Sequence, residues 1–308
     1  ALHSNNLEVA EISPEAFNEM TAIDFITGQI PAENNEIDHE AFQSLQDWNS
    51  EENPNIKSGK IDFGIRSITL NINQICNLKC AYCAAGGDGT YGEPSTQISV
   101  EKTQPQLRFF LESLKPGSKF AISFVGGEPL LHPLAIKAIY DFTHSEAQKR
   151  QITPRMKIVT NGTLFSDENL AILRQMKVNL TISFDGVKDK NDLVRPSKDG
   201  KSTTEKILAG LKKLQADRGQ IESINFSAIT TKDNPNLYEN FLFLNSLNPD
   251  SLDFVFANEE KSQEVQNQFL ADFDKILSDL WAENGEKGIR KINTIASYFS
   301  ALDSQRRI

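Results

Sequence analysis

Six short stretches with the residue pattern of β-strands recur between residues 61 and 260, and helical patterns follow five of them. The first, residues 65–72, alternates apolar Ile68, Leu70 and Ile72 with polar residues, which is the two-residue period of a strand. Strands that alternate with helices are typical of a parallel sheet with right-handed crossovers. Because six units are fewer than the eight of a closed barrel, the pattern fits a partial (β/α)6 barrel or an open doubly wound sheet.

The later elements follow from the same patterns. We expect the other strands at residues 119–125, 156–160, 178–184, 221–229 and 251–256. We expect helices over about 132–149, after Ser166, from Ser202, over 237–246 and over about 262–283. Ser166 suits a helix start because acidic residues follow it, and Ser202 with Glu205 has the spacing of a capping box.

Polar or glycine-rich loops follow the first four strands, at residues 76–92, 126–129, 161–163 and 185–195. In α/β folds, ligands bind outside the carboxyl ends of the strands. We therefore expect the chemistry of this chain at that end of its sheet.

The segments on either side of the α/β region differ from it. Residues 1–60 end in an acidic, Asn-rich stretch and form an N-terminal accessory segment and linker, or a partly ordered tail. Residues 61–260 form the core. Residues 261–308 read as a C-terminal helical segment with no terminator at its end, so the beginning of a missing C-terminal domain is a further interpretation.

The charge balance argues against some classes of partner. The chain carries 32 basic and 42 acidic residues, a formal net charge of −10, whereas nucleic-acid binding needs a basic face. No apolar run approaches the roughly 18 residues of a membrane span, and the N-terminus lacks the basic and apolar regions of a signal peptide. We therefore expect a cytoplasmic protein with no nucleic-acid or membrane partner.

All three cysteines of the sequence, Cys76, Cys80 and Cys83, lie in one loop directly after the first strand. An odd number so tightly clustered is a poor disulfide framework, and in a reducing compartment it indicates metal binding or catalysis. Structural zinc and fully ligated iron–sulfur clusters usually have four protein ligands. Three thiolates would leave one iron of a [4Fe–4S] cluster open, as in a catalytic site; zinc or plain buried thiols are the alternatives.

The C-x3-C-x2-C loop, with Tyr82 before its last cysteine, resembles the radical S-adenosylmethionine (SAM) superfamily. The resemblance extends over residues 61–260 through the segments FVGGEP (124–129), TNGT (160–163) and SFDG (183–186), each at a strand end. It implies a partial (β/α)6 barrel of the radical SAM type with short accessory segments. It also implies a [4Fe–4S] cluster and SAM as cofactors, reductive cleavage to a 5′-deoxyadenosyl radical, and an external electron donor of the flavodoxin or ferredoxin type.

The resemblance also implies roles around the cluster held by the three cysteines. Tyr82 would pack beside the cluster and the adenine. Gly126 and Gly127 would let the backbone approach the methionine ammonium group, which a Cβ would hinder. Glu128 would orient this loop rather than contact the cofactor. A plain core aromatic and a strand-ending turn are the alternatives for Tyr82 and for the glycine segment.

Four further polar residues are candidate cofactor contacts. Ser183 offers a hydroxyl suited to the ribose, and Asp185 would do the same or cap its own turn. Arg195 would pair with the cofactor carboxylate, for which a bidentate guanidinium is apt, or be a solvated loop residue. Asn161 would bond to the cofactor or substrate, or serve only as an Asn-Gly turn.

The glycine-rich segment 86–92, with its Tyr-Gly ending, resembles radical SAM enzymes that modify ribosomally made peptides. It implies hydrogen abstraction from a precursor peptide, with cross-link formation or epimerisation as the outcome, and a leader-binding role for residues 1–60 is one possibility. Many such relatives carry a C-terminal SPASM or twitch region with auxiliary clusters, but no cysteine follows Cys83 here. The alternatives are a radical SAM enzyme that acts on a small molecule or activates a partner enzyme, and a non-catalytic iron–sulfur electron-transfer protein.

Overall fold

The computed structural model describes residues 66–83, 97–257 and 262–304. Phe63–Asn293 form one compact unit. A second unit comprises Ala1–Asp62 and Thr294–Ile308, of which the structure describes only part of helix α10 (Asn293–Ser304). The predicted accessory segment 1–60 and the glycine-rich segment 86–92 lie outside the described residues.

The compact unit is built on one six-stranded parallel sheet whose strands follow their order in the chain. The strands are β1 (Ser67–Asn71), β2 (Lys119–Val125), β3 (Thr153–Thr160), β4 (Asn179–Ser183), β5 (Ser223–Thr230) and β6 (Ser251–Phe256). A doubly wound sheet would reverse its strand order at a switch point, and this sheet does not. The structure thus confirms the partial (β/α)6 barrel, with β1 and β6 as its edges.

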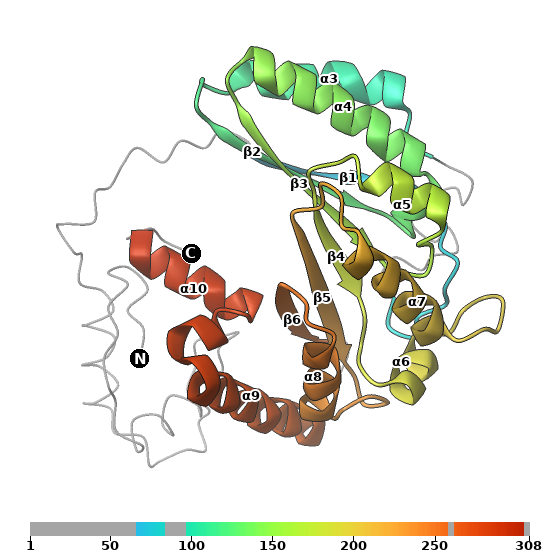
Figure 1. The fold of residues 1–308 in the computed structure, drawn as a ribbon, viewed down its shortest axis with the longest axis vertical. Coiled ribbons are helices and arrows are strands. Elements are labelled where there is room, and N and C mark those ends of the chain that lie inside the picture. The colour runs from blue at the N-terminus through green and yellow to red at the C-terminus, as the bar shows by residue number, and fades with distance from the viewer. Residues whose placement is uncertain (1–65, 84–96, 258–261, 305–308) are drawn as a thin grey trace, which may run out of the picture. The chain divides into compact units, whose positions relative to one another are not determined.

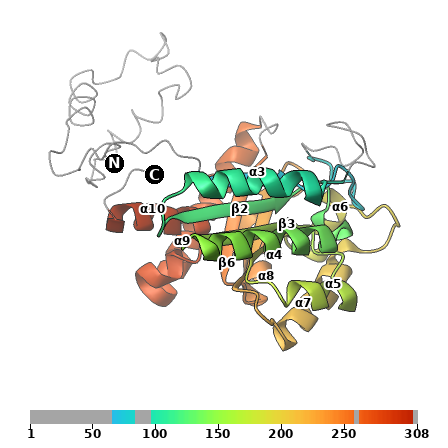
Figure 2. The same cartoon turned by 90° about the horizontal axis from the view of Figure 1, so that it is seen from above.

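Helices cover the convex side of the curved sheet (Figure 1). They are α3 (Val100–Ser113), α4 (Pro133–Lys149), α5 (Asp167–Leu173), α6 (Lys188–Val194), α7 (Thr203–Ala216) and α8 (Leu237–Ser246), with a 3-10 turn, η1, at Pro129–Leu131. The two expected caps are confirmed, since Ser166 accepts from the Asn169 N–H at 3.2 Å and Ser202 from that of Glu205 at 3.1 Å. Two helices were not predicted, the short α6 and α3, which lies beside α4 and β2 in Figure 2.

The last helix of this unit, α9 (Gln263–Ile289), is longer than predicted and bends at Asn284 and Gly285. The residues that follow it run beside the first part of edge strand β6. There the Leu252 N–H donates to the Lys291 carbonyl at 2.9 Å, and Ile292 is fully buried. Capping an edge in this way removes a site where another strand would pair. No helix among the described residues is both long and apolar enough to cross a bilayer.

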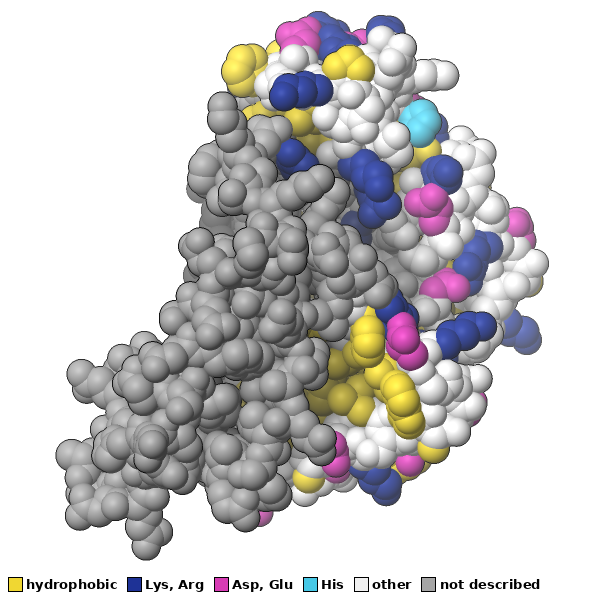
Figure 3. All heavy atoms as spheres, turned by 90° about the vertical axis from the view of Figure 1, so that its left-hand side faces the viewer, with side chains coloured by type: hydrophobic (Ala, Val, Ile, Leu, Met, Phe, Trp, Pro, Cys, Tyr) yellow, Lys and Arg dark blue, Asp and Glu magenta, His cyan; other side chains and the backbone are white. Residues whose placement is uncertain are grey.

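The core lies on both faces of the sheet, so its central strand is almost continuously buried. In β4 the side chains of Leu180, Thr181 and Ile182 are all buried, as expected for parallel strands covered on both sides. Phe184, one residue beyond β4, packs edge-to-face on Phe226 with ring centroids 5.9 Å apart. Figure 3 shows further apolar side chains in a hollow on the side of the molecule that is on the left of Figure 1. This packing fixes the ends of the strands, from which the candidate site residues project.

Candidate cofactor site at the carboxyl ends of the strands

The cysteine loop is held by backbone hydrogen bonds to a segment more than one hundred residues away. The Lys79 N–H donates to the Pro196 carbonyl at 2.9 Å, and the Lys198 N–H donates to the Asn77 carbonyl at 3.0 Å. A third bond joins the Ala81 N–H to the carbonyl of Val194. Residues 77–81 and 194–198 thus form a short antiparallel ribbon, which we call the cysteine ribbon. The α6–α7 connection is therefore part of the scaffold of the cysteine loop.

The three cysteine thiols are close enough to influence one another. Cys76 and Cys80 are half-buried and Cys83 is exposed. Burial raises the pKa of Cys76, and it raises the pKa of Cys80 to about 11 although the nearby Arg195 opposes the shift; repulsion between the thiolates adds to both. The thiols of Cys76 and Cys80 are therefore protonated at neutral pH, and a metal that binds them must displace their protons.

The donors around the thiols are compatible with an iron–sulfur cluster. Among the described residues, no three His, Cys, Asp or Glu side chains form a group that could hold one metal ion. In a four-iron cluster each cysteine ligates a different iron, so the thiolates need not converge on one point. Cys76 Sγ also accepts from the Leu78 N–H at 3.4 Å and from Asn161 Nδ2 at 3.5 Å. Donors of this kind stabilise a thiolate, and the residues present fit an iron–sulfur cluster.

Gly127 lies against the residues that lead into the cysteine loop. A Cβ at Gly127 would lie 2.0 Å from the Ile75 carbonyl oxygen. The Gly127 N–H donates to the Asn73 carbonyl at 3.0 Å, and that of Glu128 donates to the Ile75 carbonyl at 2.7 Å. The glycine thus permits close packing of two protein segments, and its expected approach to a methionine ammonium group stays a prediction.

Glu128 is fully buried and binds the end of the neighbouring strand. Its carboxylate accepts from the Leu130 N–H at 2.9 Å, the Thr160 hydroxyl at 2.6 Å and the Asn161 N–H at 2.7 Å. Burial raises the pKa of Glu128, and the three donors oppose that rise. These bonds join the loop after β2 to the end of β3, and the expected role of Glu128 in orienting the loop beside a cofactor stays a prediction.

Half-buried Tyr82 of the cysteine loop forms a triad with the buried side chains of Asp185 and Arg195. The Tyr82 hydroxyl donates to Asp185 Oδ2 and accepts from Arg195 Nη1. The guanidinium lies over the Tyr82 ring, 5.8 Å from its centroid, and 3.6 Å from Asp185 Oδ2. Arg195 is only 6% exposed, so the interpretation of a solvated loop residue is wrong. Its Nε is buried without a hydrogen-bond partner in the described part of the chain.

Asp185 does not cap its own turn, because its Oδ1 accepts from the N–H of Ile229 in the neighbouring strand β5 at 3.0 Å. The Asp185 carboxylate thus joins β4, β5 and the triad. Ser183 is half-buried opposite Ser227 of β5, and its side chain makes no hydrogen bond to any described residue. Of the two residues proposed for the ribose, Asp185 uses both carboxylate oxygens inside the protein, whereas the Ser183 hydroxyl has no partner among the described residues.

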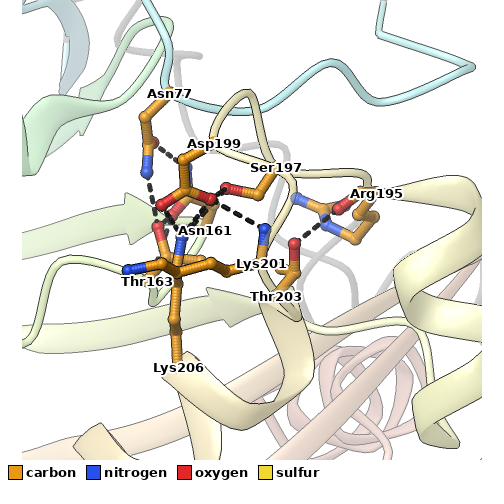
Figure 4. Close-up of polar contacts among 9 residues, drawn as sticks. All are labelled: Asn77, Asn161, Thr163, Arg195, Ser197, Asp199, Lys201, Thr203 and Lys206. Atoms are coloured by element: carbon orange, nitrogen blue, oxygen red, sulfur yellow. Dashed lines mark hydrogen bonds and ion pairs between the residues drawn. The ribbon is translucent and has the colours of Figure 1, made fainter.

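Sequence reasoning did not identify the polar residues of neighbouring loops that support the candidate site. Figure 4 shows Asn77, Asn161 and Thr163 in mutual contact, with Ser197, Asp199 and Lys206 grouped next to them. The Asn77 side chain donates to the Thr163 hydroxyl at 2.8 Å. Asp199 accepts from the Ser197 hydroxyl at 2.7 Å and from Lys206 Nζ at 2.7 and 2.8 Å. Short polar residues in both loops were the only signal, and such residues are common in loops of every kind.

A hollow of about 520 Å³ lies at the opposite, amino ends of β3 and β4. Its lining includes Tyr140, Arg155 and Lys177, and none of the candidate residues contributes to it. The chemistry of the cysteine loop is therefore separate from this hollow.

Comparisons with known proteins agree with the geometry. The model of a family described as the Radical SAM superfamily matches residues 70–251. The GTP 3′,8-cyclase of Parasynechococcus marenigrum is 31% identical over 156 residues, which cover 48% of this chain and 42% of that enzyme. The serine-type anaerobic sulfatase-maturating enzyme of Klebsiella aerogenes is 29% identical over 142 residues, which cover 46% of this chain and 34% of that enzyme.

The fold is also found in solved structures. A structure of native anSMEcpe with bound AdoMet and the Kp18Cys peptide superposes with a TM-score of 0.59 at 20% identity, over 71% of this chain and 62% of that one. The matched segments span less than half the length of the two enzymes above. The similarity to anSMEcpe is one of fold.

Proposed function

Because the chain belongs to the radical SAM superfamily, we propose that it is an enzyme that abstracts a hydrogen atom from a ribosomally made precursor peptide. The family uses a [4Fe–4S] cluster and S-adenosylmethionine, which together supply a reactive organic radical that attacks unactivated C–H bonds. The observation that carries the proposal is the set of three thiols in one loop. This loop bonds to Asn161 at the end of β3 and, through the cysteine ribbon, to the α6–α7 connection. Three thiolates leave one iron open to the cofactor.

Cys76, Cys80 and Cys83 would ligate the cluster, and each must lose its proton to do so. The raised pKa values of Cys76 and Cys80 mean that ligation competes with protons. Burial also limits the access of water to this side of the loop. The protein's part is to hold the cofactors in place and to exclude competing reactions.

Arg195 and Ser183 would bind the polar groups of S-adenosylmethionine. The pairing of Arg195 with Asp185 and Tyr82 fixes the guanidinium, and its buried Nε still lacks a partner among the described residues. A fixed guanidinium with a donor to spare suits a carboxylate. The half-buried hydroxyl of Ser183 suits a ribose. Gly126 and Gly127 would present their backbone to the ammonium group, and Tyr82 would flank the adenine.

Two similar proteins that act on or bind polypeptides support the peptide substrate. One matures a sulfatase, and the other has been solved with a bound peptide. The product would be a cross-link or an epimerised residue, and an external flavodoxin or ferredoxin would supply electrons. A relative that is a GTP 3′,8-cyclase supports a second candidate, a small-molecule substrate.

The central experiment measures 5′-deoxyadenosine. We expect the reconstituted chain with dithionite and S-adenosylmethionine to produce it, and we expect Cys80→Ala to produce none. Exposed Ser113→Ala serves as the control and should behave like the wild type. If the wild-type chain binds a cluster whose spectrum does not change when S-adenosylmethionine is added, the protein would instead be an electron-transfer protein.

The substrate class needs a second measurement. We expect a candidate precursor peptide, incubated in D2O with the loaded enzyme, to lose two hydrogens on cross-linking or to gain one deuterium on epimerisation. Mass spectrometry detects both changes. Consumption of GTP with an unchanged peptide mass would favour the small-molecule candidate.

A further inference from the structure

Asn161 is held rigidly at the end of β3. Its backbone N–H donates to Glu128 Oε2 at 2.7 Å. Its side-chain oxygen accepts from the Thr163 N–H at 3.0 Å and from the Thr163 hydroxyl at 2.6 Å. Two donors on one oxygen identify that atom as Oδ1, so the NH2 group of the amide faces the opposite way.

The NH2 group of Asn161 faces the cysteine loop. Nδ2 lies 3.5 Å from Cys76 Sγ and 2.9 Å from Asn77 Oδ1. A neutral amide has two donor hydrogens and an oxygen with two lone pairs. All four are used inside the protein, and the residue is only 5% exposed. The side chain therefore has no hydrogen-bonding capacity left for a cofactor or a substrate, which was one of its expected roles.

The Asn161 amide makes Cys76 different from the other two cysteines. Cys76 Sγ receives the amide and the Leu78 N–H. Within the described residues, neither Cys80 nor Cys83 receives a hydrogen bond at sulfur. A reduced cluster carries one more negative charge than the oxidised one, so N–H donors at its thiolates stabilise the reduced form. Hydrogen bonds to the sulfurs are one of the factors that set the reduction potential of such clusters.

We propose that Asn161 is a positioning residue that raises the reduction potential of the cluster through its hydrogen bond to Cys76. This inference rests on one element of the proposed function, that the three cysteines bind a cluster, and it is independent of the substrate. Glu128 and Thr163 orient the donor. The amide makes the cluster easier to reduce, and so it favours electron delivery from the donor protein.

A redox titration of the reconstituted chain, followed by electron paramagnetic resonance, tests the proposal. In Asn161→Ala the midpoint should move to a more negative potential. At the potential where half of the wild-type cluster is reduced, the ratio of oxidised to reduced cluster should rise at least threefold. This ratio corresponds to about 28 mV, at 59 mV per tenfold change for one electron.

Two further variants make the test specific. Thr163→Val keeps the amide but removes the hydroxyl that orients it, so a smaller shift of the same sign is expected. Asn225→Ala is the control, because Asn225 is a buried asparagine of β5 that bonds to Leu180 and Ser223 and not to the cysteine loop. Its midpoint should equal that of the wild type.

If the Asn161→Ala variant binds the cluster and its midpoint potential equals that of the wild type, the proposal is overturned. If Asn161→Ala takes up no cluster, Thr163→Val decides, and an unchanged midpoint in that variant overturns it equally. Failure of both variants to load would make Asn161 a structural support of the loop and refute a tuning role. The proposed function is judged separately, by 5′-deoxyadenosine formation in the wild type.

Discussion

Gly127 shows how closely two segments approach each other at the candidate site. An added Cβ would lie 2.0 Å from the Ile75 carbonyl oxygen, one residue before Cys76. Because both contacting groups are backbone, neither can move aside cheaply. We expect Gly127→Ala to displace the cysteine loop, to lower cluster uptake more than twofold, and to destabilise the fold by about 1–3 kcal/mol. Iron and sulfide analysis after reconstitution measures the first effect, and thermal unfolding measures the second.

Gly117→Ala is the matched control for this prediction. Gly117 has a φ of +82°, and a Cβ there meets nothing within 4 Å. It should therefore lose about 1–2 kcal/mol of stability through backbone strain and keep its iron content. Wild-type iron content in Gly127→Ala would show that the loop tolerates the displacement.

The buried ion pair of Asp185 and Arg195 leads to a second prediction. Asp185→Asn removes the charge that balances the guanidinium, and both side chains are almost fully buried. An uncompensated buried charge typically costs about 3–5 kcal/mol. We expect a loss of that order in the free energy of unfolding, measured on the apo chain in urea at pH 7.

The exposed pair of Lys137 and Asp141 provides the comparison. Their atoms lie 2.6 Å apart on one face of α4, and a surface pair of this kind is worth at most about 1 kcal/mol. Asp141→Asn should therefore change stability far less than Asp185→Asn does. Equal losses of stability in the two variants would show that burial does not strengthen the pairing of Asp185 with Arg195.

The identity of the site residues was more predictable than their partners. Cys76, Cys80, Cys83 and Glu128 stand in motifs only a few residues long, so the sequence alone locates them. Contacts such as Tyr82 with Asp185 join residues more than one hundred positions apart. Which polar atoms meet across such distances depends on the packing of whole strands, and a local pattern does not contain that information.

At the scale of elements, the α6–α7 connection supports the cysteine loop. Ser197 of the cysteine ribbon bonds to Asp199 and to Lys206, and these two residues bond to each other (Figure 4). Donation from Lys206 and Ser197 holds the pKa of Asp199 far below its usual range. We expect Asp199→Asn to loosen the ribbon, so that a chelator removes iron from the reconstituted chain a few times faster than from the wild type.

A similar ion pair on the same helix separates this effect from general destabilisation. Lys213 of α7 binds Asp167 of α5 at 2.8 Å, and neither residue is part of the cysteine ribbon. Asp167→Asn should leave the rate of iron loss unchanged, and Lys206→Arg should retain most of the protection. If Asp199→Asn lost iron at the same rate as the wild type, the bonds of Asp199 to Ser197 and Lys206 would have no role in retaining the cluster.

Glu146 of α4 links two helices on the outer layer and leads to a prediction about pH. Its carboxylate binds Lys149 at 2.7 Å and Arg150 at 2.7 Å, and Arg150 also binds Glu112 of α3. These hydrogen bonds lower the pKa of Glu146 to about 2. A carboxyl whose pKa is lower in the folded chain stabilises it above the unfolded pKa of about 4.3, and this contribution disappears as the pH falls towards 2.

We therefore expect Glu146→Gln to melt below the wild type at pH 7, with the difference shrinking between pH 4 and pH 2. Thermal unfolding across this range measures it. Glu101, an exposed residue of α3, gives the control variant Glu101→Gln, whose difference from the wild type should stay near zero. A difference that does not depend on pH would mean that Glu146 acts through packing alone.

Elements with a clear apolar pattern were easier to predict than the others. Residues 119–125, 237–246 and 251–256 were placed within the observed bounds of β2, α8 and β6, because each is a clear apolar pattern with turn residues at its ends. Helix α3 contains Pro105 and many exposed positions, and α6 is seven residues of mainly polar character. Ser99 caps α3, whose buried Thr103, Leu107 and Leu111 recur every four residues, so the obstacle to predicting it was Pro105 and not a missing period. Helix α6 has no side-chain cap and is held by the packing of Asn191 and Val194.

At the scale of the molecule, the alternation of strand and helix patterns in the sequence did not predict the order of the strands in the sheet. Both candidate folds consist of the same units, and they differ only in which strands become neighbours. The observed order places the loops after β1, β2, β3 and β4 side by side along one curved edge. The cysteines, Glu128, Asn161 and Asp185 each come from a different one of these loops. The site therefore forms only when four strands are correctly paired.

This dependence leads to a prediction about the whole molecule. A ligand that binds only the folded chain stabilises it by about 2.7 kcal/mol at one hundred times its dissociation constant. We expect S-adenosylmethionine to raise the melting temperature of the chain loaded with its cluster, and to leave the apo chain and Cys80→Ala nearly unchanged. Only three cysteines are present in the sequence, so the loaded chain should contain about four irons. Stabilisation of the apo chain to the same extent would show that the cofactor binds without the open iron, and a count near eight would require ligands other than these thiolates.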